Sequence, residues 1–283
     1  MSRSVPKPGR VHEVSSVSNP LVKSIKGLAL KKNRDVERVF LAEGQKLVTD
    51  ALEAGWTVRT LIHAKTLLED PRQSDAVSAL AVKVRATGGD ILIVSEKVLT
   101  AISRRDNAQM IMAVIEQKTS DPQDLNVATD SVWVALDRVR DPGNLGTIIR
   151  TADALGVGAV MLVGQTADPF SMEAVRATMG SLFHVPLIRL DATDFRRHVT
   201  HWRDAHGGQV IGTHLAGAVD HRSIDYSGRP QLIVMGNEQQ GLPDELAEIC
   251  DKLALIAMSG EADSLNLAVA TGIMLFEARR NAL

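Results

Sequence analysis

Short apolar runs alternate with amphipathic stretches in the first part of the chain, a pattern that predicts strands and helices in turn. The expected strands are 39–42, 58–62, 91–94 and 110–116, and the expected helices are 45–54, 74–85 and 96–102. This alternation predicts a small layered α/β domain over residues 13–118, preceded by a disordered tail of residues 1–12. Polar residues 119–130 show no periodicity and predict a linker.

Residues 131–283 alternate in the same way, and their apolar runs read as buried strands. The expected strands are 132–136, 159–163, 185–188, 210–213, 232–235 and 253–257, and the expected helices are 145–155, 172–179, 195–205, 244–249 and about 266–280. Strands that are apolar along their whole length are typical of a parallel sheet with helices on both faces. We therefore expect an α/β fold whose second domain is built on a mostly parallel sheet.

Three of these strands run directly into polar, glycine-bearing loops. The segments 232–242, 132–144 and 253–266 each begin as an apolar strand, and they reach Glu238, Asn144 and Ser264 respectively. The carboxyl ends of parallel strands meet at one edge of a sheet, where helix N-termini also offer backbone donors. The sequence therefore predicts a ligand site at this edge.

Each polar residue of these loops also has a structural explanation. Asn144 could be the N-cap of the helix that follows, and Ser264 could cap the C-terminal helix with Asn266 in its first turn. Arg150 lies in a helix body, where an arginine is usually a solvated charge. The glycines of the 236–241 turn could serve only to adopt positive φ. The convergence of three strand ends favours the functional explanation.

Charge is distributed unevenly along the chain. The first 38 residues carry nine lysines and arginines against three acidic residues, whereas the whole chain has a net charge of -2. Clustered cations suit a polyanion such as RNA, although a solubilising tail and a solvated helix face would explain them equally well. The candidate RNA-binding residues are Lys23, Lys26, Lys31, Lys32 and Arg34.

The sequence does not support a disulfide, a metal site, a membrane segment or a glycine-rich nucleotide-binding motif. The single cysteine, Cys250, cannot form an internal disulfide or a zinc site, and a reducing cytoplasm fits this usage. No secretory signal or membrane-length apolar run is present. Gly156-Val157-Gly158 follows a helix instead of opening one and lacks a third glycine, so it reads as a helix stop. The histidines at 198, 201 and 206 lack further ligands, and we expect no metal.

The polar loops together resemble the motifs of the SpoU/TrmH family, the knotted S-adenosylmethionine-dependent RNA ribose 2′-O-methyltransferases of the SPOUT superfamily. The resemblance covers residues 131–283 and is carried by 141–146 with 150–152, 236–238 with 241–242, and 264–267 with 277–279. Residues 19–23 and 40–44 are similar to the substrate-binding domain of that family, which is of ribosomal-protein type.

This resemblance implies a trefoil knot, S-adenosylmethionine as cofactor, a homodimer formed by the catalytic domains, and a structured RNA substrate. It favours ribosomal RNA over transfer RNA, because the chain has an N-terminal substrate domain. The implied cofactor-binding residues are Thr213, His214, Leu215, Gly236, Asn237, Gly241, Ile256, Met258 and Leu265. The implied catalytic residues are Asn144, Arg150, Glu238, Ser264 and Asn266.

Methyl transfer from a sulfonium to a hydroxyl joins a cation to a developing alkoxide, so a dry and aligned pocket favours the transition state. Arg150 is the family's proposed activating residue, but a guanidinium is hard to deprotonate at neutral pH. Our hypothesis is that Arg150 and Ser264 stabilise the alkoxide near the target phosphate, while the proton leaves through phosphate or water. Asn144 and Asn266 would position Arg150, and Glu238 would orient the loop.

The chain departs from the family pattern at four positions. Ala257 stands where proline is usual, Ala268 where serine is common, Thr178 where a serine precedes Gly180, and Met110 where glycine is usual. Ala257 would loosen the cofactor loop, and Met110 bears on substrate recognition.

Two alternatives stay open from the sequence. One is a catalytically idle RNA-binding or ribosome-assembly factor on the same scaffold. The other is an α/β enzyme that uses a different nucleotide, which would have to bind NAD or ATP in place of S-adenosylmethionine.

Overall fold

The computed structural model describes residues 7–214 and 218–282, so residues 1–6 of the predicted tail and Leu215 lie outside the described residues. The chain separates into two compact units. The N-terminal unit comprises Met1–Lys118 with Phe170–Phe183, and the C-terminal unit comprises Thr119–Pro169 with His184–Leu283. None of the described helices combines the length and the apolar composition that a membrane crossing requires.

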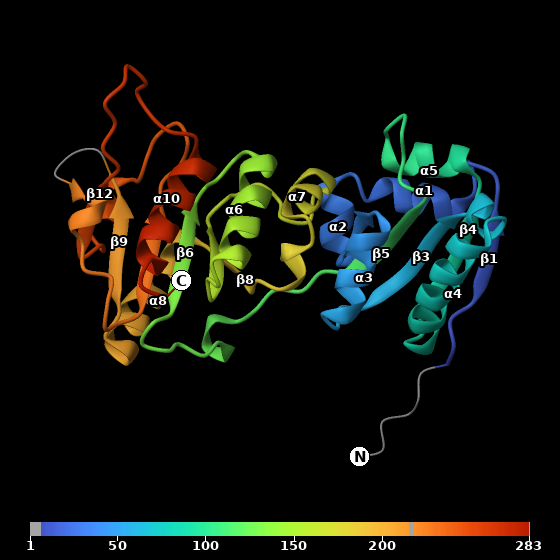
Figure 1. The fold of residues 1–283 in the computed structure, drawn as a ribbon, viewed down its shortest axis with the longest axis horizontal. Helices are drawn as coiled ribbons and strands as arrows, with labels where there is room; N and C mark the ends of the chain where they lie inside the picture. The colour runs from blue at the N-terminus through green and yellow to red at the C-terminus, as the bar shows by residue number, and fades with distance from the viewer. Residues whose placement is uncertain (1–6, 215–217, 283) are drawn as a thin grey trace, which may run out of the picture. The chain divides into compact units, whose positions relative to one another are not determined.

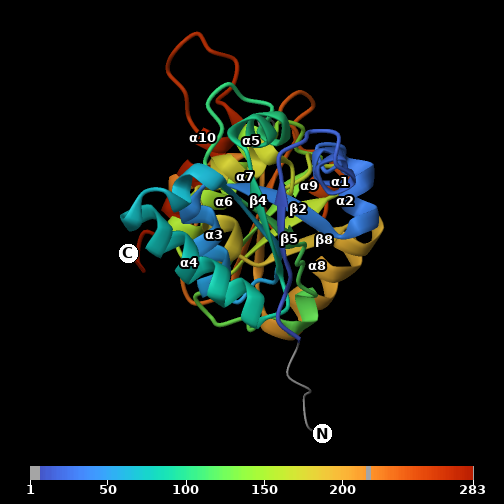
Figure 2. The same cartoon turned by 90° about the vertical axis from the view of Figure 1, so that its right-hand side faces the viewer.

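The N-terminal unit is a five-stranded mixed sheet in the order β1-β4-β3-β5-β2, with helices α3 and α4 on one face and α1 on the other (Figures 1 and 2). Its strands are β1 (Val11–Val14), β2 (Val39–Glu43), β3 (Val58–Ala64), β4 (Asp90–Val94) and β5 (Ile111–Glu116). Its helices are α1 (Pro20–Gly27), α2 (Lys31–Glu37), α3 (Gln45–Glu53), α4 (Pro71–Ala86), α5 (Glu96–Ser103) and α7 (Met172–Thr178), with 3-10 turns η1 (Lys65–Leu68) and η3 (Ser181–Phe183). Strand β5 runs antiparallel to β2 and β3, and the other pairs are parallel.

The start of the N-terminal unit differs from the expectation. Val11 and His12, which the sequence assigned to a disordered tail, belong to β1 and pair in parallel with β4. The main-chain N–H of Arg10 also donates to Asp90 Oδ1 at 2.7 Å. Helix α1 begins at Pro20 because Asn19 caps it by accepting from the main-chain N–H of Leu21 at 2.9 Å.

Glu43, in the 40–44 motif, is a buried junction of the N-terminal unit. Its carboxylate accepts from Ser103 Oγ at 2.6 Å and from the main-chain N–H of Gln109 at 3.1 Å, and it forms an ion pair with Arg176 of α7. A buried charge needs this number of partners to offset its desolvation. The ion pair, together with the ring contact of Phe170 with Phe40, links the segment that carries α7, expected in the second domain, to the N-terminal unit.

The C-terminal unit is a seven-stranded sheet in the order β10-β12-β9-β11-β6-β7-β8, and every neighbouring pair is parallel. Its strands are β6 (Val132–Asp137), β7 (Ala159–Val163), β8 (Leu187–Leu190), β9 (Gln209–Thr213), β10 (Val219–Asp220), β11 (Gln231–Met235) and β12 (Lys252–Leu255). Its helices are α6 (Pro142–Ala154), α8 (Ala192–His206), α9 (Asp244–Ala247) and α10 (Leu267–Arg279), with 3-10 turns η2 (Pro122–Asp124) and η4 (His221–Ser223).

Both faces of this sheet are covered, which confirms the predicted architecture. Helices α8 and α9 supply Phe195, Trp202 and Leu246 to a core cluster on one face, while α6 and α10 pack together over the other (Figure 1). The predicted linker, 119–130, packs onto this unit, since Leu125 and Val127 lie against the same cluster. The short strand β10 was not predicted.

Candidate functional site

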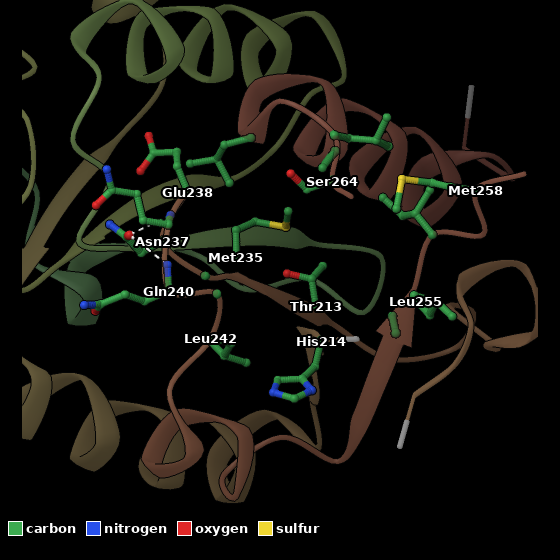
Figure 3. A pocket seen from close by; sticks show the side chains of 18 residues that line it. Thr213, His214, Met235, Asn237, Glu238, Gln240, Leu242, Leu255, Met258 and Ser264 are labelled. Atoms are coloured by element: carbon green, nitrogen blue, oxygen red, sulfur yellow. Dashed lines mark hydrogen bonds between the residues drawn. The ribbon is translucent and has the colours of Figure 1, made fainter. Parts of the chain in front are cut away.

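The carboxyl ends of β9, β11 and β12 enclose a cavity of about 450 Å³, a size typical of small-molecule sites. Figure 3 shows Glu238 and Ser264 along one side of this space, with Thr213 and His214 along the other. The predicted residues that line it are Thr213, His214, Gly236, Asn237, Glu238, Gly241, Ile256, Met258, Ser264 and Leu265. Leu215 lies outside the described residues. Two of the three predicted strand ends, those of β11 and β12, therefore converge on the cavity, whereas the third wall comes from β9 and none of the described residues of the loop after β6 lines it.

The turn after β11 forms one wall of the cavity and depends on close backbone packing. A Cβ atom on Gly236 would lie 2.2 Å from the main-chain nitrogen of Leu242, a distance that real side chains do not reach. Gly236 does not have a positive φ, so the close approach of the backbone is what requires glycine there. Gly241, in contrast, has a φ of 68°. Asn237 and Gly241 close the turn with main-chain hydrogen bonds of 3.0 and 2.9 Å.

The buried side chain of Asn237 is committed to holding this turn. Its Nδ2 donates to the carbonyl of Arg138 at 2.7 Å, and its Oδ1 accepts from the main-chain N–H of Gln239 at 2.9 Å. With Oδ1 and one N–H donor occupied, this carboxamide can offer a cofactor at most its second N–H donor, so Asn237 serves the cavity chiefly through its main chain.

A line of polar side chains joins the three loops at the cavity edge. Asn144 Nδ2 donates to Glu238 Oε1 at 3.4 Å, and Asn266 Nδ2 donates to Asn144 Oδ1 at 2.9 Å. Glu238 lines the cavity, whereas Asn144 and Asn266 lie behind it and are absent from its lining residues. The two asparagines do not face the ligand space. They hold Glu238 in position through hydrogen bonds.

The helix caps near the site differ from the sequence prediction. Asp141, instead of Asn144, is the N-cap of α6, and its Oδ1 accepts from the main-chain N–H of Asn144 at 2.5 Å. Asn266, instead of Ser264, caps α10 by accepting from the N–H groups of Ala268 and Val269. Because Asn266 takes the capping role, Ser264 is left in the loop and lines the cavity.

Two arginines connect the loop after β6 to the turn after β11 through hydrogen bonds. The guanidinium of Arg138 binds the buried Asp137 through Nε and Nη2 at 2.9 and 2.8 Å, and its Nη1 donates to Gln240 Oε1 at 3.2 Å. Arg138 adopts a φ of 46°, a conformation that this pairing helps to hold. Arg140 Nη1 donates to Gln239 Oε1 at 3.0 Å.

Arg150 does not meet the other predicted catalytic residues within its own chain. It is exposed on α6, it is absent from the residues that line the cavity, and it has no hydrogen-bond or ion-pair partner among residues 7–214 and 218–282. Its neighbours Ile148 and Ile149 are buried, so the helix directs Arg150 outward.

The predicted RNA-binding cations are of two kinds. Lys23, Lys26, Lys31 and Lys32 are exposed or half-buried, and the described part of the chain offers none of them an ion pair. Arg34, by contrast, is buried, and its Nη1 donates to the carbonyls of Leu28 at 2.6 Å and Ala29 at 3.0 Å. The Arg34 prediction was wrong, because this guanidinium satisfies carbonyls at the end of α1.

Sequence reasoning missed a part of the cavity wall. The additional lining residues are Met235, Gln239, Gln240, Leu242, Ala254, Leu255, Leu267 and Ala270. All of them lie within or beside the three motif segments, so the segments could have identified them although no single residue type stands out. Ala257, where the family pattern has proline, is exposed in the loop after β12, which ends at Leu255.

Comparison with known proteins matches both units. The SpoU rRNA Methylase family profile matches residues 131–276, and the MRM3-like substrate binding domain profile matches residues 19–113. The chain is similar to the 23S rRNA (guanosine(2553)-2′-O)-methyltransferase RlmP of Bacillus subtilis, with 34% identity over 94% of this chain and 99% of the relative. A 23S rRNA (uridine(2479)-2′-O)-methyltransferase of Streptomyces viridochromogenes is 32% identical over 85% of this chain and 82% of the relative.

Solved structures agree with the sequence matches. The AdoMet-bound rRNA methyltransferase from Sinorhizobium meliloti is 53% identical and covers 96% of this chain and 99% of its own, with a TM-score of 0.89. The SpoU methyltransferase AviRb from Streptomyces viridochromogenes, in complex with AdoMet, is 30% identical and covers 93% and 98% of the two chains, with a TM-score of 0.81.

Proposed function

Since the chain belongs to the SpoU rRNA Methylase family, we propose that it methylates the 2′-hydroxyl of one ribose in 23S ribosomal RNA. It is an RNA 2′-O-ribose methyltransferase, and its methyl donor is S-adenosylmethionine. The observation that carries the proposal is the cavity at the ends of β9, β11 and β12, with Glu238 and Ser264 on its wall. The relatives at 34% and 32% identity act on two different nucleotides of 23S rRNA, so the target nucleotide stays open.

The cavity fits S-adenosylmethionine in size and chemistry. Met235, Leu242 and Leu255 offer apolar walls to an adenosine, and the close backbone packing at Gly236 leaves main-chain groups beside the ligand space. When bound, the cofactor supplies a methyl group on a sulfonium. A largely apolar wall excludes water from the reacting atoms, which favours a step in which charge is annihilated.

The residues at the cavity edge would position the ribose and stabilise its oxygen. Ser264 can donate its hydroxyl proton in a hydrogen bond to the developing alkoxide. Glu238, supported by Asn144 and by the main-chain N–H of Arg140 at 3.4 Å, would orient the loop that carries it. Arg150 would stabilise the alkoxide next to the target phosphate, and the proton would leave through phosphate or water.

We propose that the chain acts as a homodimer through α10. Val269 and Phe276 are 53% and 57% exposed, and they stand one heptad apart on this helix, so they form an apolar stripe that a second copy could cover. Helix α6 packs beside α10. A partner on this face would place the exposed Arg150 at the protomer interface, where it could serve the cavity of the other protomer.

The N-terminal unit would hold the RNA substrate. Its match to a substrate binding domain supports this role, and so do the four lysines on α1 and α2 that form no ion pair with any described residue. Single phosphate contacts are sequence-independent, so these lysines would contribute affinity more than choice of nucleotide.

Two further expectations also remain proposals. A trefoil knot is supported by the position of β12 between β9 and β10, because the chain must pass β9 after leaving β11. A cytoplasmic location would follow from the proposed substrate.

Mapping ribose methylation on 23S rRNA from a strain that lacks the gene tests the main proposal. One 2′-O-methyl mark should be absent, and purified protein with tritiated S-adenosylmethionine should restore it on that RNA. Calorimetric binding of S-adenosylmethionine without transfer to any RNA would support the idle assembly factor instead. Binding of NAD or ATP, without binding of S-adenosylmethionine, would support an α/β enzyme that uses a different nucleotide.

A further inference from the structure

The arginines of the C-terminal unit are mostly neutralised by carboxylates. Those within 4.0 Å of a carboxylate oxygen are Arg138, Arg189, Arg196, Arg197, Arg203, Arg222 and Arg280. Arg279 donates to the main-chain carbonyls of Leu155 and Asp130. Within the described ranges, only Arg140, Arg150 and Arg229 of this unit are exposed without such a partner.

Arg140 differs from the other two in its position. It lies in the loop between β6 and α6, at the carboxyl edge of the sheet. Its guanidinium rests on Gln239, which lines the cavity. Arg229 precedes β11 and therefore lies at the opposite edge of the same sheet, and Arg150 lies two turns into α6.

The acidic residues next to Arg140 do not neutralise it. The Glu238 carboxylate faces the main-chain N–H of Arg140, at 3.4 Å to both oxygens, and the side chain of Asn144. Asp141 Oδ1 accepts from the main-chain N–H of Asn144. Among residues 7–214 and 218–282, the Arg140 side chain thus has a neutral amide oxygen as its partner, and most of its five N–H donors remain available.

A planar cation that stays unpaired at the rim of a ligand cavity matches an anion with several acceptor oxygens, and phosphate is the anion that RNA presents. Arg138, two residues earlier, shows the contrast, because its guanidinium is bound to Asp137 and Gln240. We propose that Arg140 contacts a backbone phosphate of the RNA substrate beside the target ribose and so positions that ribose at the cavity. This inference rests on the proposed function.

The test uses the full-length protein and an unmodified 23S rRNA transcript made in vitro. Arg140→Gln keeps the main-chain contact to Glu238 and replaces the guanidinium with a neutral polar group, so the cation is removed. We expect KM for the transcript to rise by about three- to tenfold, with kcat within about twofold and the Kd for S-adenosylmethionine unchanged. The slope of log affinity for RNA against log salt should become shallower by about 0.7 to 0.9.

Arg229→Gln is the matched control, since it removes another exposed arginine that has no carboxylate oxygen within 4.0 Å in the described part of the chain and that lies at the other edge of the sheet. It should leave KM and the salt slope at wild-type values. Arg140→Lys should keep the salt slope, because the charge remains, while KM rises by less than it does in Arg140→Gln.

Three outcomes would overturn the inference. They are an unchanged salt slope in Arg140→Gln, an equal loss in Arg229→Gln, and a fall in kcat or in S-adenosylmethionine affinity at unchanged KM. If wild-type protein neither binds nor methylates the transcript, the proposed function fails together with the inference. If the wild type is active and Arg140→Gln behaves identically, only the inference fails.

Discussion

The carboxamides of Asn144 and Asn266 meet in a hydrogen bond of 2.9 Å, although 122 positions separate them in the sequence. Asn144 also reaches Glu238, and Asn266 begins α10 as its N-cap. These hydrogen bonds link the first turn of α6 both to the turn after β11 and to the start of α10. This geometry couples the position of Glu238 to the capping of α10.

Replacing Asn266 with aspartate separates capping from this coupling. Aspartate keeps an oxygen that can accept from Ala268 and Val269 but loses the donor to Asn144. We expect the midpoint of thermal unfolding to stay close to the wild-type value while kcat falls by about tenfold or more. Asn266→Ala should lose activity and, in addition, about 1 kcal/mol of stability with the cap. Full activity in Asn266→Asp would show that the asparagine pair has no positioning role.

Gly236→Ala should strongly weaken cofactor binding. The new Cβ would lie 2.2 Å from the nitrogen of Leu242 and 2.3 Å from the carbonyl carbon of Gly241, so the turn that walls the cavity must move. Calorimetry should show at least about a hundredfold loss of affinity for S-adenosylmethionine, which corresponds to roughly 2.7 kcal/mol. Gly260→Ala is the control, since its Cβ would meet no atom within 4 Å. Equal affinities in the two variants would contradict the assigned wall.

The main strands and the site edge could be predicted from the sequence because they depend on local patterns. Strands β6, β7 and β11 are buried along their whole length, so an unbroken apolar run identifies each of them. Strand β1 is an edge strand whose Val11 is 52% exposed, and such a segment gives no clear pattern. The cap of α6 was wrong by three residues, although proline at the first helical position favours Asp141 over Asn144.

Relationships that depend on distant partners could not be predicted in this way. Nothing near Gly236 indicates that Leu242 passes against its backbone, and nothing near Arg176 indicates its ion pair with Glu43. Arg34 has the same chemistry as the lysines around it, and only its burial shows that it serves the fold. Charge type is readable from sequence, whereas the partner of a charge is set by packing.

Arg34 and Lys32 should therefore respond differently to the loss of charge. Arg34→Gln leaves the carbonyls of Leu28 and Ala29 without their charged donor, so the free energy of unfolding should fall by roughly 1.5 to 3 kcal/mol. Lys32→Gln removes an exposed charge and should leave stability unchanged while it weakens binding to 23S rRNA in low salt. Urea unfolding and a filter-binding titration measure the two effects. Weaker RNA binding without destabilisation in Arg34→Gln would restore Arg34 to the RNA-binding residues.

Acidification should destabilise the protein through two histidines. Burial lowers the pKa of His63 and of His198, and the ring of His198 is stacked on Trp133 with 6.2 Å between centroids. A lowered folded-state pKa means that the unfolded chain binds more protons. The free energy of unfolding is therefore unaffected by protonation of these two histidines above about pH 6.5, and it decreases as the pH falls below that value. The midpoint of thermal unfolding should decrease between pH 7 and pH 5.

A variant comparison can assign part of this pH dependence. His198→Gln removes one of the two titrating groups, so the decrease between pH 7 and pH 5 should be smaller than in the wild type. His184→Gln changes an exposed histidine and should leave the decrease intact. If His198→Gln and His184→Gln follow the same pH curve as the wild type, His198 does not contribute.

The exposed position of Arg150 predicts complementation between two inactive variants. If Arg150 serves the cavity of the partner, Arg150→Ala has an intact cavity and Gly236→Ala has an intact arginine. In a mixed dimer one site then combines both intact parts, while the other site lacks both. Random pairing in a symmetric dimer should restore about a quarter of the wild-type sites. Co-expression with two affinity tags, followed by tritium transfer to 23S rRNA, measures this recovery. Activity no higher than that of the two separate variants would show that Arg150 acts on the cavity of its own chain, and a monomer by sedimentation would contradict the dimer itself.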